Sequence, residues 1–182
     1  MPTDDTIPAE RFALFRRIFA AWALLGGLLL TGVVLVNVLS VVGAALFTLN
    51  EQGSLAGLLP SWLASPVPGD FELTEMGVCI AVFAFLPYCQ ITRSNVTADI
   101  FTSRASRRWV ARFSLLAALI ALGFMALLAW RMFFGMRDQL QYGYTTAILQ
   151  IEHGYAFIPI LISLVFAAIA AALTLAEDAA QV

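Results

Sequence analysis

An unbroken apolar run near the N-terminus constrains the fold of this chain more than any other feature of its sequence. The run extends from Ile18 to Leu49 without one charged residue. As a single α-helix it would be roughly 48 Å long, against about 30 Å for the hydrocarbon core of a bilayer. A helix of this kind must tilt strongly or project beyond the membrane. The run therefore predicts a membrane-spanning first helix.

The rest of the chain repeats this pattern. Hydrophobic residues make up 61% of the 182 positions and charged residues 12%, whereas soluble domains have about 45–50% apolar and about 25% charged residues. The runs show no alternation of apolar and polar residues, which excludes the strands of a membrane β-barrel. We therefore expect an all-α integral membrane protein in which residues 1–182 form a single membrane domain. Its four transmembrane helices are expected at about 18–45, 73–91, 110–134 and 155–176.

The distribution of arginine predicts how these helices are oriented. All ten basic residues are arginines, and the first loop, Asn50–Glu72, has none. The third loop has only Arg137, with Arg131 at its edge. Loops that carry positive charge remain in the cytoplasm, so both termini are expected inside. The arginines of the expected inner side are Arg11, Arg16 and Arg17 in the N-terminal tail and Arg93, Arg104, Arg107, Arg108 and Arg112 in or beside the second loop.

The second loop has the pattern of an amphipathic helix. In the stretch Val96–Arg108, the apolar face of Val96, Ile100 and Phe101 lies opposite Arg104, Arg107 and Arg108. Each arginine near an anionic inner leaflet contributes on the order of 1 kcal/mol of attraction. We expect this helix to lie on the cytoplasmic leaflet, with the three arginines in contact with membrane lipids. The polar chain ends, including Glu177–Val182, are expected to fray.

The residues that most enzymes and cofactor sites need are scarce. The single histidine, His153, falls in an outer loop, which argues against paired-histidine haem, Ser–His and histidine–metal sites. Cys79 and Cys89 are not a C-x-x-C pair, and no glycine-rich phosphate loop is present. The net charge of −2 gives no basic surface for nucleic acid. We predict no catalytic residue, no metal and no cofactor. An acid–base enzyme that uses only Asp, Glu and Arg at the membrane edge is the alternative.

Three polar residues stand out inside or beside the spans. Asn37 is expected to form a hydrogen bond between helices. Glu75 lies about one turn inside the outer end of the second span, and Arg131 lies at a similar depth in the third. Lone charges at such positions are costly, so we hypothesise a partly buried Glu75–Arg131 ion pair. The alternatives for Glu75 are a contact with a partner subunit and ion coupling.

Several short segments together resemble a known family. They are Gly69–Gly77, Leu86–Gln90, Arg93–Asp99 and the outer stretch Gly143–Thr146 with Ile148 and Leu149. This order of motifs on four helices resembles the small membrane subunit of the tripartite ATP-independent periplasmic (TRAP) transporters, the DctQ-like family.

Within that resemblance, Glu75 matches a glutamate at the start of the second helix. Arg93, Val96 and Asp99 fit a basic–glycine–histidine–hydrophobic–x–x–aspartate pattern, in which Ser94 and Asn95 replace the glycine and the histidine.

The resemblance implies a non-enzymatic scaffold subunit in the bacterial inner membrane. Its partners would be a large membrane subunit, which binds substrate and sodium, and a periplasmic binding protein, which delivers an organic acid such as a dicarboxylate, keto acid or sugar acid. No substrate site is then expected in this chain. Candidate structural or subunit-interface residues are Glu75, Arg131, Asn37, Arg93 and Asp99, and candidate contacts with the binding protein are Tyr142, Tyr144 and Glu152.

A self-sufficient small exporter is the rival interpretation. The small multidrug-resistance type also has four helices and one membrane glutamate, but its glutamate lies deep in the first helix. Here the first apolar run contains no acidic residue, and Glu75 lies near the end of the second. These differences favour the accessory subunit.

Overall fold

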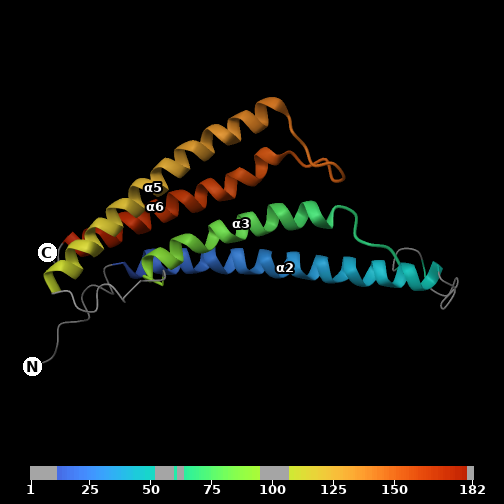
Figure 1. Cartoon of the computed structure of the whole chain (residues 1–182), viewed down its shortest axis with the longest axis horizontal. Coiled ribbons are helices and arrows are strands. Elements are labelled where there is room, and N and C mark those ends of the chain that lie inside the picture. Colours follow the sequence, from blue (N-terminus) through green and yellow to red (C-terminus); the bar gives the residue numbers. More distant parts are fainter. Residues whose placement is uncertain (1–11, 52–59, 61–63, 95–106, 180–182) are drawn as a thin grey trace, which may run out of the picture.

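The chain forms four long helices, as the apolar runs predicted. The computed structural model describes residues 12–51, 60, 64–94 and 107–179. All four helices are long and apolar enough to cross a membrane, and the described residues contain no strand beyond the isolated bridge Thr145–Glu152, so the all-α expectation is confirmed. The helices are α2 (Ala13–Glu51), α3 (Asp70–Ile91), α5 (Arg107–Tyr142) and α6 (Phe157–Ala179), with a short 3-10 helix, η1 (His153–Ala156), before α6 (Figure 1).

Two of the helices are longer than the apolar runs suggested. The 39 residues of α2 correspond to ~58 Å and the 36 residues of α5 to ~54 Å at 1.5 Å per residue. Both continue into polar flanks because no proline interrupts them. Helix α5 ends where Gly143 adopts a φ of 63°, the left-handed conformation that commonly terminates helices. Likewise α3 begins directly after Gly69, whose φ is 76°.

The helices pack in the order α2, α3, α6, α5. Helix α3 contacts α2 on one side and α6 on the other, and α6 contacts α5, so Figure 1 shows a layer of two helix pairs set at an angle. We call the end where α2 begins and α6 ends the terminal end. The opposite end, formed by residues 64–69 and 143–152, is the loop end.

Helices α2 and α6 also meet directly. The indole Nε1 of Trp22 donates a hydrogen bond of 2.9 Å to Ser163 Oγ, and the rings of Phe19 and Phe166 lie 5.6 Å apart. From this contact towards the loop end the two helices diverge (Figure 1).

Small residues line the contacts between helices. Gly26 of α2 lies so close to α3 that an added Cβ would be 2.7 Å from Cβ of Ala84. Ala81 and Ala84 of α3 and Ala167, Ala170 and Ala171 of α6 are buried. Small side chains let helix backbones approach closely, which matters in lipid because no hydrophobic force drives helices together there.

The expected fraying of the C-terminus is wrong for residues 177–179. Helix α6 continues to Ala179, and Asp178 is one of its buried residues. The reason is that the Asp178 carboxylate pairs with Arg93 at the end of α3 and accepts a hydrogen bond from Ser114 of α5. The remaining residues of that tail, 180–182, lie outside the described part of the chain.

Candidate functional site: polar contacts at the two ends of the layer

Charged groups are confined to the two ends of the helices. No charged residue occurs between Arg17 and Glu51 in α2, after Glu75 in α3, between Arg112 and Arg131 in α5, or before Glu177 in α6. The polar contacts that could carry function therefore form one cluster at the terminal end and another at the loop end.

At the terminal end, a buried carboxylate joins three helices. Arg93 Nη2 lies 2.5 Å from Asp178 Oδ1 and 3.5 Å from Glu177 Oε2. The other oxygen of Asp178 accepts a hydrogen bond of 2.8 Å from Ser114 Oγ of α5. The Asp178 side chain is 5% exposed, whereas that of Arg93 is 47% exposed. We call Arg93, Asp178 and Ser114 the terminal clamp.

The backbone at the end of α3 presents Arg93 to this site. The N–H of Thr92 donates to Tyr88 O and that of Ser94 to Cys89 O, while Arg93 adopts a φ of 52°. This left-handed residue stops the helix and turns the chain at the point where its guanidinium meets α6. Arg93, a candidate structural residue in the sequence, is thus placed in a contact between helices of the same chain.

Sequence reasoning missed Asp178 and Ser114. A signal was present, because Glu177 and Asp178 are acidic residues at the same predicted membrane side as Arg93. Because the tail was expected to fray, its acidic residues were not considered as partners of Arg93. A charged group that ends a long apolar helix beside an arginine-bearing loop indicates a pairing rather than a loose end.

At the loop end, hydrogen bonds join α2 to α3. Asn37 Nδ2 donates to Thr74 Oγ1 at 2.5 Å and to Val33 O at 2.9 Å, so the interhelical hydrogen bond expected of Asn37 is present. One turn further, the hydroxyl of Ser40 donates to an oxygen of Asp70 and accepts the N–H of Val67 at 3.2 Å. The segment that enters α3 is therefore fixed along α2.

Glu72 fixes the connection between α5 and α6. Its two carboxylate oxygens accept the backbone N–H groups of Ile148 at 2.7 Å and Leu149 at 2.9 Å. The connection itself is ordered by the hydrogen bonds between Thr146 and Ile151. We call residues 143–152 the outer hairpin, after the side of the membrane on which the arginine distribution predicts it. The outer hairpin is therefore held against α3 by Glu72, a residue that sequence reasoning did not single out.

The residues suggested as contacts for a binding protein all lie in or beside the outer hairpin. Tyr142 and Tyr144 are 68% and 56% exposed, and their rings lie 5.8 Å apart. Glu152 is half-buried and forms the bridge with Thr145. The two tyrosines thus form an exposed pair, whereas Glu152 belongs to the hairpin's backbone pairing.

The hypothesised Glu75–Arg131 ion pair is not formed. Both side chains are exposed, and the only ion pairs among the described residues are those of Arg93. The reason is the packing order, because α6 contacts both α3 and α5, the helices that carry the two residues. The pair was inferred from depth alone, and depth does not determine which helices are neighbours.

The remaining predicted residues belong to the second loop. Asp99, Arg104 and most of the predicted amphipathic stretch Val96–Arg108 lie outside the described residues, and Arg107 and Arg108 begin helix α5. Among the residues that the structure describes, no group of three or more His, Cys, Asp or Glu side chains could hold a metal ion. Cys79 and Cys89 are both free thiols.

Comparison with known proteins places these features in a family. The family model described as tripartite ATP-independent periplasmic transporters, DctQ component, matches residues 61–181. This range includes α3, α5, the outer hairpin, α6 and all three residues of the terminal clamp. No curated protein and no solved structure matches the chain. Because the model covers well over half of the sequence, the chain belongs to the DctQ family of TRAP transporter components.

Proposed function

We propose that this chain is the rigid scaffold subunit of a sodium-driven importer of an organic acid. As a DctQ component it is the small subunit of a tripartite transporter of the inner membrane, and it is not an enzyme. The scaffold role, the sodium coupling and the substrate class, a dicarboxylate, keto acid or sugar acid, are the parts proposed here. A large membrane subunit would bind substrate and sodium, and a periplasmic binding protein would deliver the substrate.

The placement of polar groups carries the proposal of a scaffold. A chain that moves substrate or couples to an ion needs polar or ionisable groups at mid-depth, and the centres of all four helices carry no charge. Instead, hydrogen bonds and ion pairs fasten the helices at both ends. A layer fastened in this way resists changes in the angles between its helices.

The exposed apolar surface supports docking to a large membrane subunit. In the most apolar stretch of α5 only 6% of the residues are buried, against 33% in α6. Exposed side chains such as Phe113, Phe124 and Trp130 cover α5. We propose that the large subunit covers part of this surface and lipid covers the rest.

Glu75 and Arg131 fit the same proposal. Each is an exposed charge on a membrane-spanning helix, without an ion pair in the described part of the chain. A charge at this depth is costly unless it is paired or reaches the membrane surface. We therefore assign both residues to contacts with the large subunit, the alternative that the sequence left open for Glu75.

The proposal also includes the orientation of the chain in the membrane. The arginine distribution supports a cytoplasmic terminal end and a periplasmic loop end. In that orientation the stretch Val96–Arg108 would rest on the inner leaflet through Arg104, Arg107 and Arg108. The exposed pair Tyr142 and Tyr144 would face the binding protein.

Affinity purification from native membranes tests the proposal. A tagged version of this chain should retain a much larger membrane protein, and proteoliposomes should take up the organic acid only when both proteins, the binding protein and a sodium gradient are present. Transport by this chain alone would support the exporter instead. Glu75→Gln separates the two interpretations, because it should abolish transport in an exporter but should weaken retention of the large subunit in a scaffold.

A further inference from the structure

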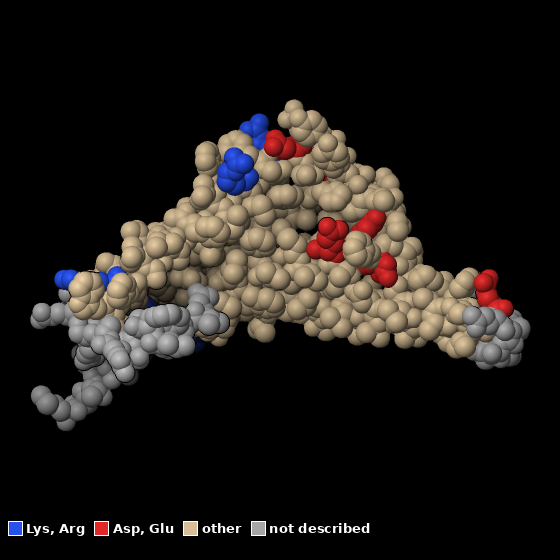
Figure 2. Space-filling view, in the orientation of Figure 1, with Lys and Arg blue, Asp and Glu red and all other residues tan. Residues whose placement is uncertain are grey.

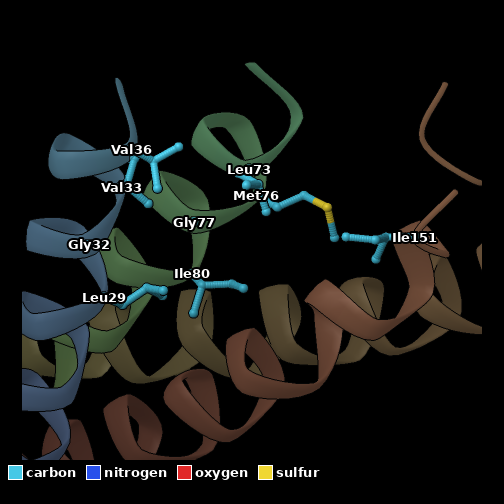
Figure 3. Close-up of a pocket in the computed structure, with 9 residues that line it drawn as sticks. All are labelled: Leu29, Gly32, Val33, Val36, Leu73, Met76, Gly77, Ile80 and Ile151. Carbon is cyan, nitrogen blue, oxygen red and sulfur yellow. The ribbon is translucent and has the colours of Figure 1, made fainter. Parts of the chain in front are cut away.

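An apolar groove opens on the layer where α2 and α6 diverge. It has a volume of about 320 Å³ and is lined by Leu29, Gly32, Val33 and Val36 of α2, Leu73, Met76, Gly77 and Ile80 of α3, and Ile151 of the outer hairpin (Figure 3). Every one of these residues is apolar. We infer that this groove binds one acyl chain of an amine-bearing phospholipid such as phosphatidylethanolamine.

The length and the apolar lining of the groove suit part of a hydrocarbon chain. The lining residues of α2 and of α3 each extend over eight positions, which corresponds to ~10 Å along a helix. A fatty-acyl chain is longer than this groove, so part of one chain would lie in it.

Two residues determine the shape of the groove. Gly32 has nothing within 4 Å of the position where a Cβ would be, so the floor of the groove is open at that residue. At the loop end, the flexible side chain of Met76 extends towards Ile151 and closes the groove on that side (Figure 3). Methionine adapts readily to irregular apolar surfaces, which suits contact with a chain that has no fixed shape.

The negative charges around the loop end favour a lipid whose headgroup carries an ammonium group. Asp70, Glu72 and Glu152 lie within three residues of lining positions, and Figure 2 shows acidic side chains gathered around the start of α3. No lysine or arginine occurs anywhere in residues 18–92 or 143–156. A lipid with net negative charge would meet only repulsion here, whereas an ammonium group is attracted to the carboxylates.

Photolabelling of the full-length chain in native membrane vesicles tests this inference. The probes are phosphatidylethanolamine and phosphatidylglycerol that carry the same diazirine-labelled acyl chain, and mass spectrometry locates the labelled residues. Gly32→Leu fills the groove. Gly123→Leu is the matched control, because Gly123 also has open space around it, but it lies on α5, away from the groove.

The ethanolamine probe should label Met76 and Ile80 above the level of equally exposed positions on α5. This excess should disappear in Gly32→Leu and persist in Gly123→Leu. Added phosphatidylethanolamine should also raise the melting temperature of the purified wild-type chain and of Gly123→Leu, but not that of Gly32→Leu, because a ligand stabilises only a state that binds it.

Three results would overturn the inference. Uniform labelling of all four helices would show bulk lipid only, and equal labelling by phosphatidylglycerol would remove the role of the amine. Labelling of groove residues in the purified chain, but not in native vesicles, would assign the groove to the large subunit in the assembled transporter. This last result would still agree with the scaffold function, so the two proposals fail independently.

Discussion

Arg93 and Asp178 form an ion pair of 2.5 Å across 85 residues of sequence. The pair joins the residue that ends α3 to the last turns of α6, and Ser114 extends the contact to α5. A single buried carboxylate therefore fixes three of the four helices at the end that we assign to the cytoplasm.

Removing Arg93 should loosen this end. In Arg93→Ala, the buried carboxylate of Asp178 loses its charged partner, and leaving such a group unsatisfied costs about 1–3 kcal/mol. Urea unfolding in detergent micelles measures the loss of unfolding free energy. Arg137→Ala, which removes an exposed arginine that has no ion pair among the described residues, serves as the control. Equal stability of the two variants would contradict the clamp.

The Asn37–Thr74 hydrogen bond should couple α2 to α3. In a double-mutant cycle with Asn37→Leu and Thr74→Val, we expect an interaction energy of about 0.6–2 kcal/mol, the range found for hydrogen bonds between membrane helices. The same cycle with Asn37→Leu and Thr48→Val should give no coupling, because Thr48 bonds only within its own helix. Additive effects in both cycles would mean that the hydrogen bond does not link the helices.

Glu72 should control the order of the outer hairpin. Glu72→Ala removes the acceptors of the Ile148 and Leu149 N–H groups, so hydrogen–deuterium exchange of a peptide covering residues 146–151 should become faster. Glu75→Ala, a nearby acidic residue that makes no such contact, should leave that exchange unchanged. Protection that survives in Glu72→Ala would show that the hairpin is held by other contacts.

Close packing of α2 on α3 should depend on Gly26. Its added Cβ would lie 2.7 Å from Ala84, so Gly26→Leu should force the helices apart and reduce stability by about 1–3 kcal/mol. Gly123→Leu, which meets nothing within 4 Å, should leave the melting temperature nearly unchanged. If the two variants melt alike, the close approach at Gly26 is not important for stability.

The sequence predicted the positions of the helices better than it predicted which helices pack against each other. Long uncharged runs are sufficient to predict spans such as α3, because lipid leaves the backbone few alternatives to a helix. Depth along a span also follows from rise per residue, and Asn37 does bond across to α3. The packing order does not follow from depth, which is why Glu75 was assigned to Arg131 and why the partner of Arg93 was missed.

The central claim is that this chain holds its shape while the transporter works. We would replace Cys79 and Cys89 by serine, introduce Trp22→Cys and Ser163→Cys at the contact between α2 and α6, and join the new thiols with a short bis-maleimide. Sodium-driven uptake by proteoliposomes that contain the complete transporter is then compared before and after cross-linking. A rigid scaffold predicts the same uptake in both states, whereas uptake that stops on cross-linking would show that these helices move during transport and would contradict the account.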